Sequence, residues 1–119
     1  MIMDLTSAVG KHAEWKTKFR SAITKKEEMD AATIAKDNCC ELGKWLHGEA
    51  KAQFGALTSY KECIQKHAAF HTEAAKVAAA INAKKFTEAE AMLGNGTGYT
   101  KVSGEVGVAI MHLKKEAGL

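Results

Sequence analysis

Residues 59–83 read SYKECIQKHAAFHTEAAKVAAAINA, and this stretch decides the fold. Its apolar residues and histidines recur at steps of three and four, which places them on one face of an α-helix. Ser59 and Glu62 have the spacing of an N-terminal capping box, so we expect the helix to begin near Ser59 and to end near Ala83. The stripe that this helix buries consists of Tyr60, Ile64, His67, His71, Ala74, Ala78 and Ile81.

A helix with the same periodicity is predicted earlier in the chain, from about Asp4 to Lys25. Its polar side carries lysines, and His12 lies on the opposite, apolar stripe. We therefore expect the His12 ring to face inward. The stripe consists of Leu5, Ala8, Val9, His12, Trp15, Phe19, Ala22 and Ile23.

The rest of the chain divides into shorter helical pieces. We expect a short helix from Asp30 to Lys36, capped by Asp30. The next helix should run from Cys40 toward Ala52, with Asp37 or Asn38 as its N-cap and Gly55 at its end. A capping box at Thr87 and Glu90 should open a further helix, and a last helical stretch should run from Tyr99 to Leu113. The glycine-rich run 94–98 is expected to form a break or a sharp kink before the last helical stretch.

The composition favours an all-α protein. The 119 residues include no proline, while 21 alanines, 16 lysines and 11 glutamates favour helix formation. No repeat or long linker divides the chain, so we expect residues 1–119 to form a single domain. The predicted architecture is an antiparallel four-helix bundle with a short extra helical segment and a kinked last helix.

The charge pattern argues against nucleic acid and membranes as partners. The net charge of +3 is spread along the chain without a basic block, and Arg20 is the only arginine. Apolar runs are too short to span a bilayer and no signal-peptide core follows Met1, so we expect a cytoplasmic protein. Three cysteines, an odd number, argue against a disulfide framework in that compartment.

The histidines indicate a metal site. His67 and His71 are four residues apart, so both rings leave one helix face one turn apart and can reach a single ion. They lie on the buried stripe, where unpaired imidazoles are costly. With His12 and Cys40 from two other helices, they suit a tetrahedral zinc site. Four protein ligands leave no position for a catalytic water, so we expect a structural or sensory site and not an enzyme.

Two of these residues also have an ordinary structural interpretation. His12 would then be a core histidine bonded to a carbonyl, and Cys40 a small buried apolar residue. At a helix N-terminus, the Cys40 thiol is expected to have a lowered pKa because the helix dipole favours the thiolate. Gly43 follows on the adjacent turn, where it lets another backbone or a bulky side chain approach closely.

Three motifs at matching separations resemble the chemoreceptor zinc-binding domain family, over roughly residues 8–113. They are His12-x-x-Trp15, Cys40-x-Leu-Gly-x-Trp45-Leu46 and His67-x-x-Phe70-His71.

The resemblance implies a helical bundle that holds one Zn²⁺ per chain through His12, Cys40, His67 and His71. It also implies a homodimer in the cytoplasm, attached to the signalling region of a bacterial chemoreceptor or to a diguanylate cyclase, or occurring alone. Domains of this family are implicated in sensing zinc, and in sensing oxidants such as hypochlorous acid through the zinc-bound thiolate.

The remaining cysteines and histidines receive separate predictions. The family pattern does not require Cys39, so ligand exchange or a vicinal pair between Cys39 and Cys40 stays open. Cys63, one turn before the histidine pair, is expected to be a core residue beneath the site. His47 and His112 have no matching partners and are expected at the surface.

Other functions are weighed against this one. A hemerythrin-like iron- and oxygen-binding bundle needs carboxylate ligands, but the only His-x-x-x-Glu pattern joins His112 to Glu116 near the C-terminus. A zinc hydrolase needs an open coordination position. A stand-alone structural zinc module would bind the metal without an output domain, and a helical interaction module would keep the histidines as core residues.

Overall fold

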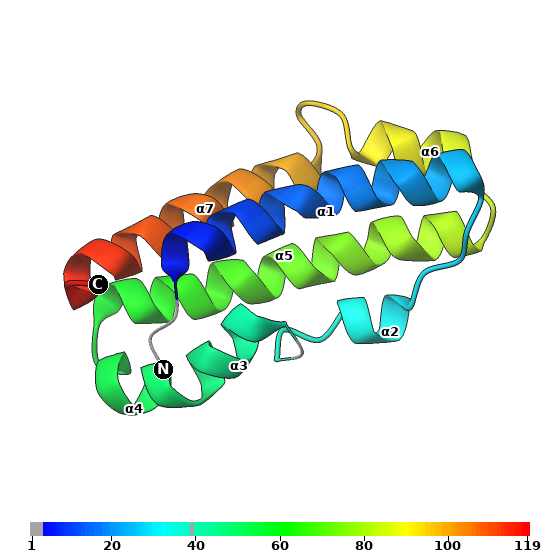
Figure 1. Ribbon diagram of the computed structural model, residues 1–119. Helices are drawn as coiled ribbons and strands as arrows, with labels where there is room; N and C mark the ends of the chain where they lie inside the picture. Colours follow the sequence, from blue (N-terminus) through cyan, green and yellow to red (C-terminus); the bar gives the residue numbers. More distant parts are fainter. Residues whose placement is uncertain (1–3, 39) are drawn as a thin grey trace.

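The computed structural model describes residues 4–38 and 40–119, and these residues form seven helices and no strands (Figure 1). The prediction of an all-α protein is thus confirmed. The long helices are α1 (Leu5–Lys25), α5 (Thr58–Asn82) and α7 (Gly98–Ala117), and the short ones are α2 (Ala31–Ile34), α3 (Glu41–His47), α4 (Glu49–Phe54) and α6 (Phe86–Met92).

Helices α1, α5 and α7 pack side by side as a bundle. Figure 1 shows that α1 and α5 run in the same direction and that α7 runs in the opposite direction. The core includes Phe19 of α1, Phe70 of α5 and Ile110 of α7, whose side chains are fully buried. Burial of such a side chain contributes about 1.5–3 kcal/mol, so contacts of this kind hold the three helices together.

The fourth side of the bundle is built from short helices. Figure 1 shows α2, α3 and α4 following one another back along α5. Helix α2 lies where the short helix from Asp30 to Lys36 was predicted, and α3 and α4 lie where the sequence predicted one helix between residues 40 and 52. That prediction is wrong in one respect, because Gly48, with φ −108° and ψ −107°, separates α3 from α4. The expected end at Gly55 is confirmed, and Leu42 and Leu46 of α3 are buried in the core.

The predicted N-cap at Asp30 is confirmed, and Asp4 caps α1 in the same way. The Asp4 side chain accepts a hydrogen bond from Ser7 N at 3.1 Å, and the Asp30 side chain accepts one from Thr33 N at 3.1 Å. Each carboxylate satisfies a backbone donor that has no partner within its helix.

The two predicted capping boxes are wrong. Helices α5 and α6 follow Leu57 and Lys85, and neither of these residues provides a side-chain cap. Ser59 lies one residue inside α5, where its N–H and Oγ donate to Glu116 of α7 at 3.1 and 2.7 Å. A carboxylate from another helix therefore occupies the position that Glu62 would have taken, while Thr87 is exposed within α6.

Of the two alternatives predicted for the glycine-rich run 94–98, the structure shows a complete break and not a kink within the last helix. Helices α6 and α7 are separate and the connection between them passes through Gly96, whose φ of 79° lies in the left-handed region that favours glycine. Thr97 begins the next helix by accepting a hydrogen bond from Thr100 N at 3.2 Å. Among the described residues, no helix is long and apolar enough to cross a membrane.

Candidate metal centre

Two helices and one helix cap bring the predicted ligands together. His67 and His71 lie one turn apart on α5, His12 lies on α1, and Cys40 is the N-cap of α3. The cap was expected at Asp37 or Asn38, so the structure moves it to the cysteine itself. One ligand atom from each of the four residues lies within 4.8 Å of the ligand atoms of the other three.

The distances match a tetrahedron around a metal. Cys40 Sγ lies 3.2 Å from His67 Nε2 and 3.6 Å from His71 Nε2, and the two Nε2 atoms are 3.1 Å apart. Bonds of about 2.0–2.1 Å to nitrogen and about 2.3 Å to sulfur place the vertices of a zinc tetrahedron about 3.3–3.6 Å apart. The spacing of these three donor atoms therefore fits one zinc ion, and the fourth donor, on His12, lies within 4.8 Å of them.

Backbone carbonyls orient two of the imidazole rings. Nδ1 of His12 lies 2.8 Å from the carbonyl oxygen of Ala8, and Nδ1 of His71 lies 2.8 Å from that of Ile34. A carbonyl oxygen accepts, so Nδ1 carries the hydrogen in both rings and Nε2 keeps its lone pair. This second layer of contacts is typical of metal-binding histidines.

Two ring nitrogens have no hydrogen-bond partner in the described part of the chain. They are His12 Nε2 and His67 Nδ1, and both are buried. An unpaired buried acceptor is costly, and a metal beside His12 Nε2 would satisfy it. The unpaired Nε2 favours the interpretation of His12 as a metal ligand over that of a core histidine. The hydrogen bond to a carbonyl that a core histidine was expected to make is also present, with Ala8 as the partner.

Burial keeps the three histidines neutral. It lowers the pKa of His67 to about 3, with smaller effects from His71 and His12. Burial also lowers the pKa values of His12 and His71, although their hydrogen bonds to backbone carbonyls act in the opposite direction. Neutral imidazole is the form that binds metals, so the pocket prepares the rings for that role.

The expectation for Cys40 is corrected by the structure. Burial raises the pKa of its thiol, and the backbone N–H groups of Gly43 and Leu42, which favour the thiolate, only partly offset this. The Gly43 N–H lies 3.3 Å from Sγ. Desolvation therefore outweighs the helix N-terminus, and a bound cation is needed to hold the thiolate at neutral pH.

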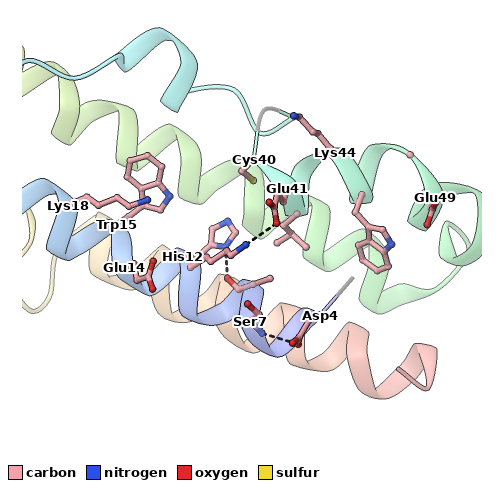
Figure 2. Close-up of a pocket in the computed structure, with 15 residues that line it drawn as sticks. Asp4, Ser7, His12, Glu14, Trp15, Lys18, Cys40, Glu41, Lys44 and Glu49 are labelled. Carbon is pink, nitrogen blue, oxygen red and sulfur yellow. Dashed lines mark hydrogen bonds and ion pairs between the residues drawn. The ribbon is translucent and has the colours of Figure 1, made fainter. Parts of the chain in front are cut away.

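A groove of about 770 Å³ opens beside the site, between α1 and the α3–α4 segment. Figure 2 shows His12 on one wall and Cys40 on the other. An ion pair of 2.9 Å between Lys11 of α1 and Glu41 of α3 joins the two walls. Cys40 is half-buried, whereas the three histidines are buried. Cys40 is thus the member of the site most open to solvent.

The other cysteines and histidines follow the predictions where the structure describes them. Cys63 is fully buried in the core and lies outside the four-residue group. His47 and His112 are exposed. Cys39 lies outside the described residues. Among the residues that are described, the one candidate metal group contains no carboxylate, which a hemerythrin-type site would require.

Comparison with protein families finds one match. The family model for the chemoreceptor zinc-binding domain, CZB, matches residues 12–78, which is more than half of the chain. The chain belongs to the CZB family. The matched residues include all four members of the candidate site, so the CZB domain supplies the donor set that zinc prefers. No curated protein and no solved structure gives a significant match.

Several contacts that support the CZB site had no signal in the sequence. The sequence offered a carbonyl partner for His12 without identifying it, and none for His71, since any residue offers a carbonyl. The Tyr60 hydroxyl, which was assigned to the apolar stripe, donates to the Leu46 carbonyl at 2.6 Å and ties α3 to α5.

Proposed function

We propose that this CZB domain binds one zinc ion per chain through His12, Cys40, His67 and His71, and that it acts as a sensory or regulatory module. The observation that carries the proposal is the convergence of three imidazoles and one thiol within 4.8 Å of one another, with the Cys40, His67 and His71 donors at the spacing of a zinc tetrahedron. Zinc suits this mixture of nitrogen and sulfur ligands. Four protein ligands close the coordination sphere, which favours a sensory role over a hydrolytic one.

Zinc binding would couple to folding. The ligands come from α1, α3 and α5, which the metal would join at one point. When bound, zinc supplies the positive charge that keeps the Cys40 sulfur as a thiolate. Because the four donors must be gathered to make the site, part of the binding free energy becomes free energy of folding.

The Cys40 thiolate is also the group that an oxidant would attack. Hypochlorous acid takes two electrons from the sulfur, which gains a hydroxyl group and becomes a sulfenic acid, while chloride leaves. The groove beside Cys40 supports this step because it gives small molecules a route to the sulfur. An oxidised sulfur is a weaker ligand, so the bond between α3 and the rest of the site would be lost.

Residues 37–55 are the element that we expect to respond. This segment includes α3 and α4, and its helices are interrupted at Gly48. Leu42, Leu46 and the Tyr60 hydrogen bond hold it against the bundle when the site is intact. Gly43 and Gly48 each lower its helix preference by about 1 kcal/mol, so release of Cys40 would leave it mobile.

The signalling context is part of the same proposal. The CZB family supports attachment to a chemoreceptor signalling region or to a diguanylate cyclase in the bacterial cytoplasm, with zinc, an oxidant or both as the stimulus. A homodimer would pass the change in residues 37–55 to the output domain. Light scattering is expected to give twice the chain mass of 12.8 kDa, and a monomer at high concentration would contradict the dimer.

Zinc analysis of the purified protein tests the proposal. Protein prepared with zinc available is expected to hold one ion per chain. The Cys40→Ala variant should bind zinc more weakly, and Cys39→Ala should bind it as the unmodified protein does. Equal losses in the two variants would show that the thiols exchange, and a zinc content near zero in the unmodified protein would overturn the proposal.

A further inference from the structure

Asn82, the last residue of α5, holds the backbone of Met29 with both atoms of its side-chain amide. Met29 N donates to Asn82 Oδ1 at 2.7 Å, and Asn82 Nδ2 donates to the Met29 carbonyl at 2.7 Å. The two residues are 53 positions apart in sequence. This pair of hydrogen bonds fixes the connection between α1 and α2 to the far end of α5.

The contact with Asn82 determines where α2 begins. Met29 directly precedes Asp30, the N-cap whose side chain accepts from Thr33 N. Helix α2 has only four residues, and a helix this short does not hold its position without outside contacts. Its place along α5 therefore depends on anchors such as the Asn82 amide.

The other end of α2 reaches the metal site. Ile34 is its last residue, and carbonyls at the end of a helix lack partners within it. The Ile34 carbonyl accepts the hydrogen on Nδ1 of His71 at 2.8 Å. Hydrogen bonds thus join both ends of the α2 segment to α5. Met29, just before α2, contacts Asn82, and Ile34, its last residue, contacts His71.

We propose that Asn82 is a positioning residue for His71, acting through Met29 and α2. By holding α2 in place, it keeps the Ile34 carbonyl against Nδ1 and leaves the Nε2 lone pair of His71 directed at the site. The inference rests on the proposed zinc function. It also goes beyond the family match, because Asn82 lies outside the matched residues 12–78.

The test compares Asn82→Ala with Ser59→Ala. Ser59 makes the corresponding polar contact at the opposite end of α5, with Glu116, and is remote from α2, so its variant reports general loss of stability. Histidine-selective ¹⁵N NMR of the metal-free proteins reads the tautomer of His71. Competition with a chromophoric chelator reads the zinc dissociation constant.

We expect Asn82→Ala to turn the single Nδ1–H form of His71 into a mixture of tautomers and to weaken zinc binding about 10-fold, as changes in the contacts of metal-binding histidines do. Ser59→Ala should change neither. Asn82→Asp keeps an acceptor for Met29 N and loses the donor. Its His71 tautomer and its zinc affinity should lie between those of Asn82→Ala and Ser59→Ala, and it provides the test if the alanine variant fails to fold.

Two results would overturn the inference. One is an unchanged His71 tautomer and zinc affinity in both Asn82 variants, and the other is an equal loss of affinity in Ser59→Ala. Absence of zinc binding in the unmodified protein would refute the proposed function instead, and the tautomer of His71 would still decide the role of Asn82.

Discussion

Gly43 lies so close to the carbonyl oxygen of Asp37 that a Cβ on Gly43 would overlap that oxygen. In the same turn, the Gly43 N–H donates to Cys40 Sγ. The glycine therefore lets the chain before Cys40 fold back onto α3, and this close approach fixes the direction of the thiol. The sequence predicted a close approach at Gly43, and the structure identifies the Asp37 backbone as the partner.

Replacing Gly43 with alanine should disturb the metal site. The added Cβ must displace the Asp37 carbonyl, and overpacking of this kind typically costs about 1–3 kcal/mol. We expect a lower free energy of unfolding in urea and weaker zinc binding. Gly104→Ala is the matched control, because a Cβ there meets open space on α7 and should be neutral or stabilising by about 1 kcal/mol. Equal behaviour of the two variants would contradict this account of Gly43.

Alkylation should separate the cysteines of the metal-free protein. Cys63 is fully buried, and burial raises the pKa of its thiol to about 12, so it should react with iodoacetamide only when the protein unfolds. Cys40 is half-buried beside the groove and should react first. Mass spectrometry of a Cys39→Ala background assigns the modified site. Reaction of Cys63 at the rate of Cys40 in folded protein would show that the core is open.

The metal-free protein should lose stability as the pH falls below about 6.5. Burial lowers the pKa of His67 to about 3, while the unfolded chain takes up the proton near the ordinary value of about 6.5. The unfolded state therefore binds more protons between these values, and the stabilisation present above pH 6.5 is lost toward pH 3. His67 alone should lower the free energy of unfolding by about 1.4 kcal/mol between about pH 7.5 and about pH 5.5, and the lowered pKa values of His12 and His71 act in the same direction.

Urea unfolding in the presence of a chelator measures this effect. A His67→Gln variant provides the control, since it removes one titrating ring and should flatten the dependence on pH. Stability that rises as the pH falls through this range would show that the histidines are protonated in the folded protein.

Oxidation should loosen residues 37–55 more than the rest of the chain. Loss of the Cys40 bond leaves this segment held by Leu42, Leu46 and the Tyr60 hydrogen bond. Hydrogen exchange of the zinc-bound protein before and after hypochlorous acid treatment should show faster exchange there, with α7 unchanged. If protection persists after Cys40 has demonstrably left the metal, residues 37–55 are not the responding element.

The long helices and the site residues were predictable because each rests on a pattern within one segment. The three- and four-residue spacing placed His12 on the inward face of α1, and placed His67 and His71 together on α5. The motif around Cys40 added the thiol. Helical register is thus enough to select the three histidines, and the motif selects the cysteine.

The details that failed depend on contacts between segments distant in sequence. Ser59 has the sequence pattern of a cap, but its N–H and Oγ donate to the Glu116 carboxylate of α7 instead. The Cys40 thiol sits at a helix start, but burial outweighs the effect of that position on its pKa. Neither the arrival of a distant carboxylate nor the extent of desolvation can be obtained from local spacing.

X-ray absorption at the zinc K-edge tests the central claim most directly. The account predicts one zinc per chain with three nitrogen ligands and one sulfur ligand. The sulfur should be lost in Cys40→Ala and retained in Cys39→Ala and Cys63→Ala. A sulfur ligand that persists in the Cys40→Ala variant, or an unmodified protein that holds no zinc when zinc is supplied, would contradict it.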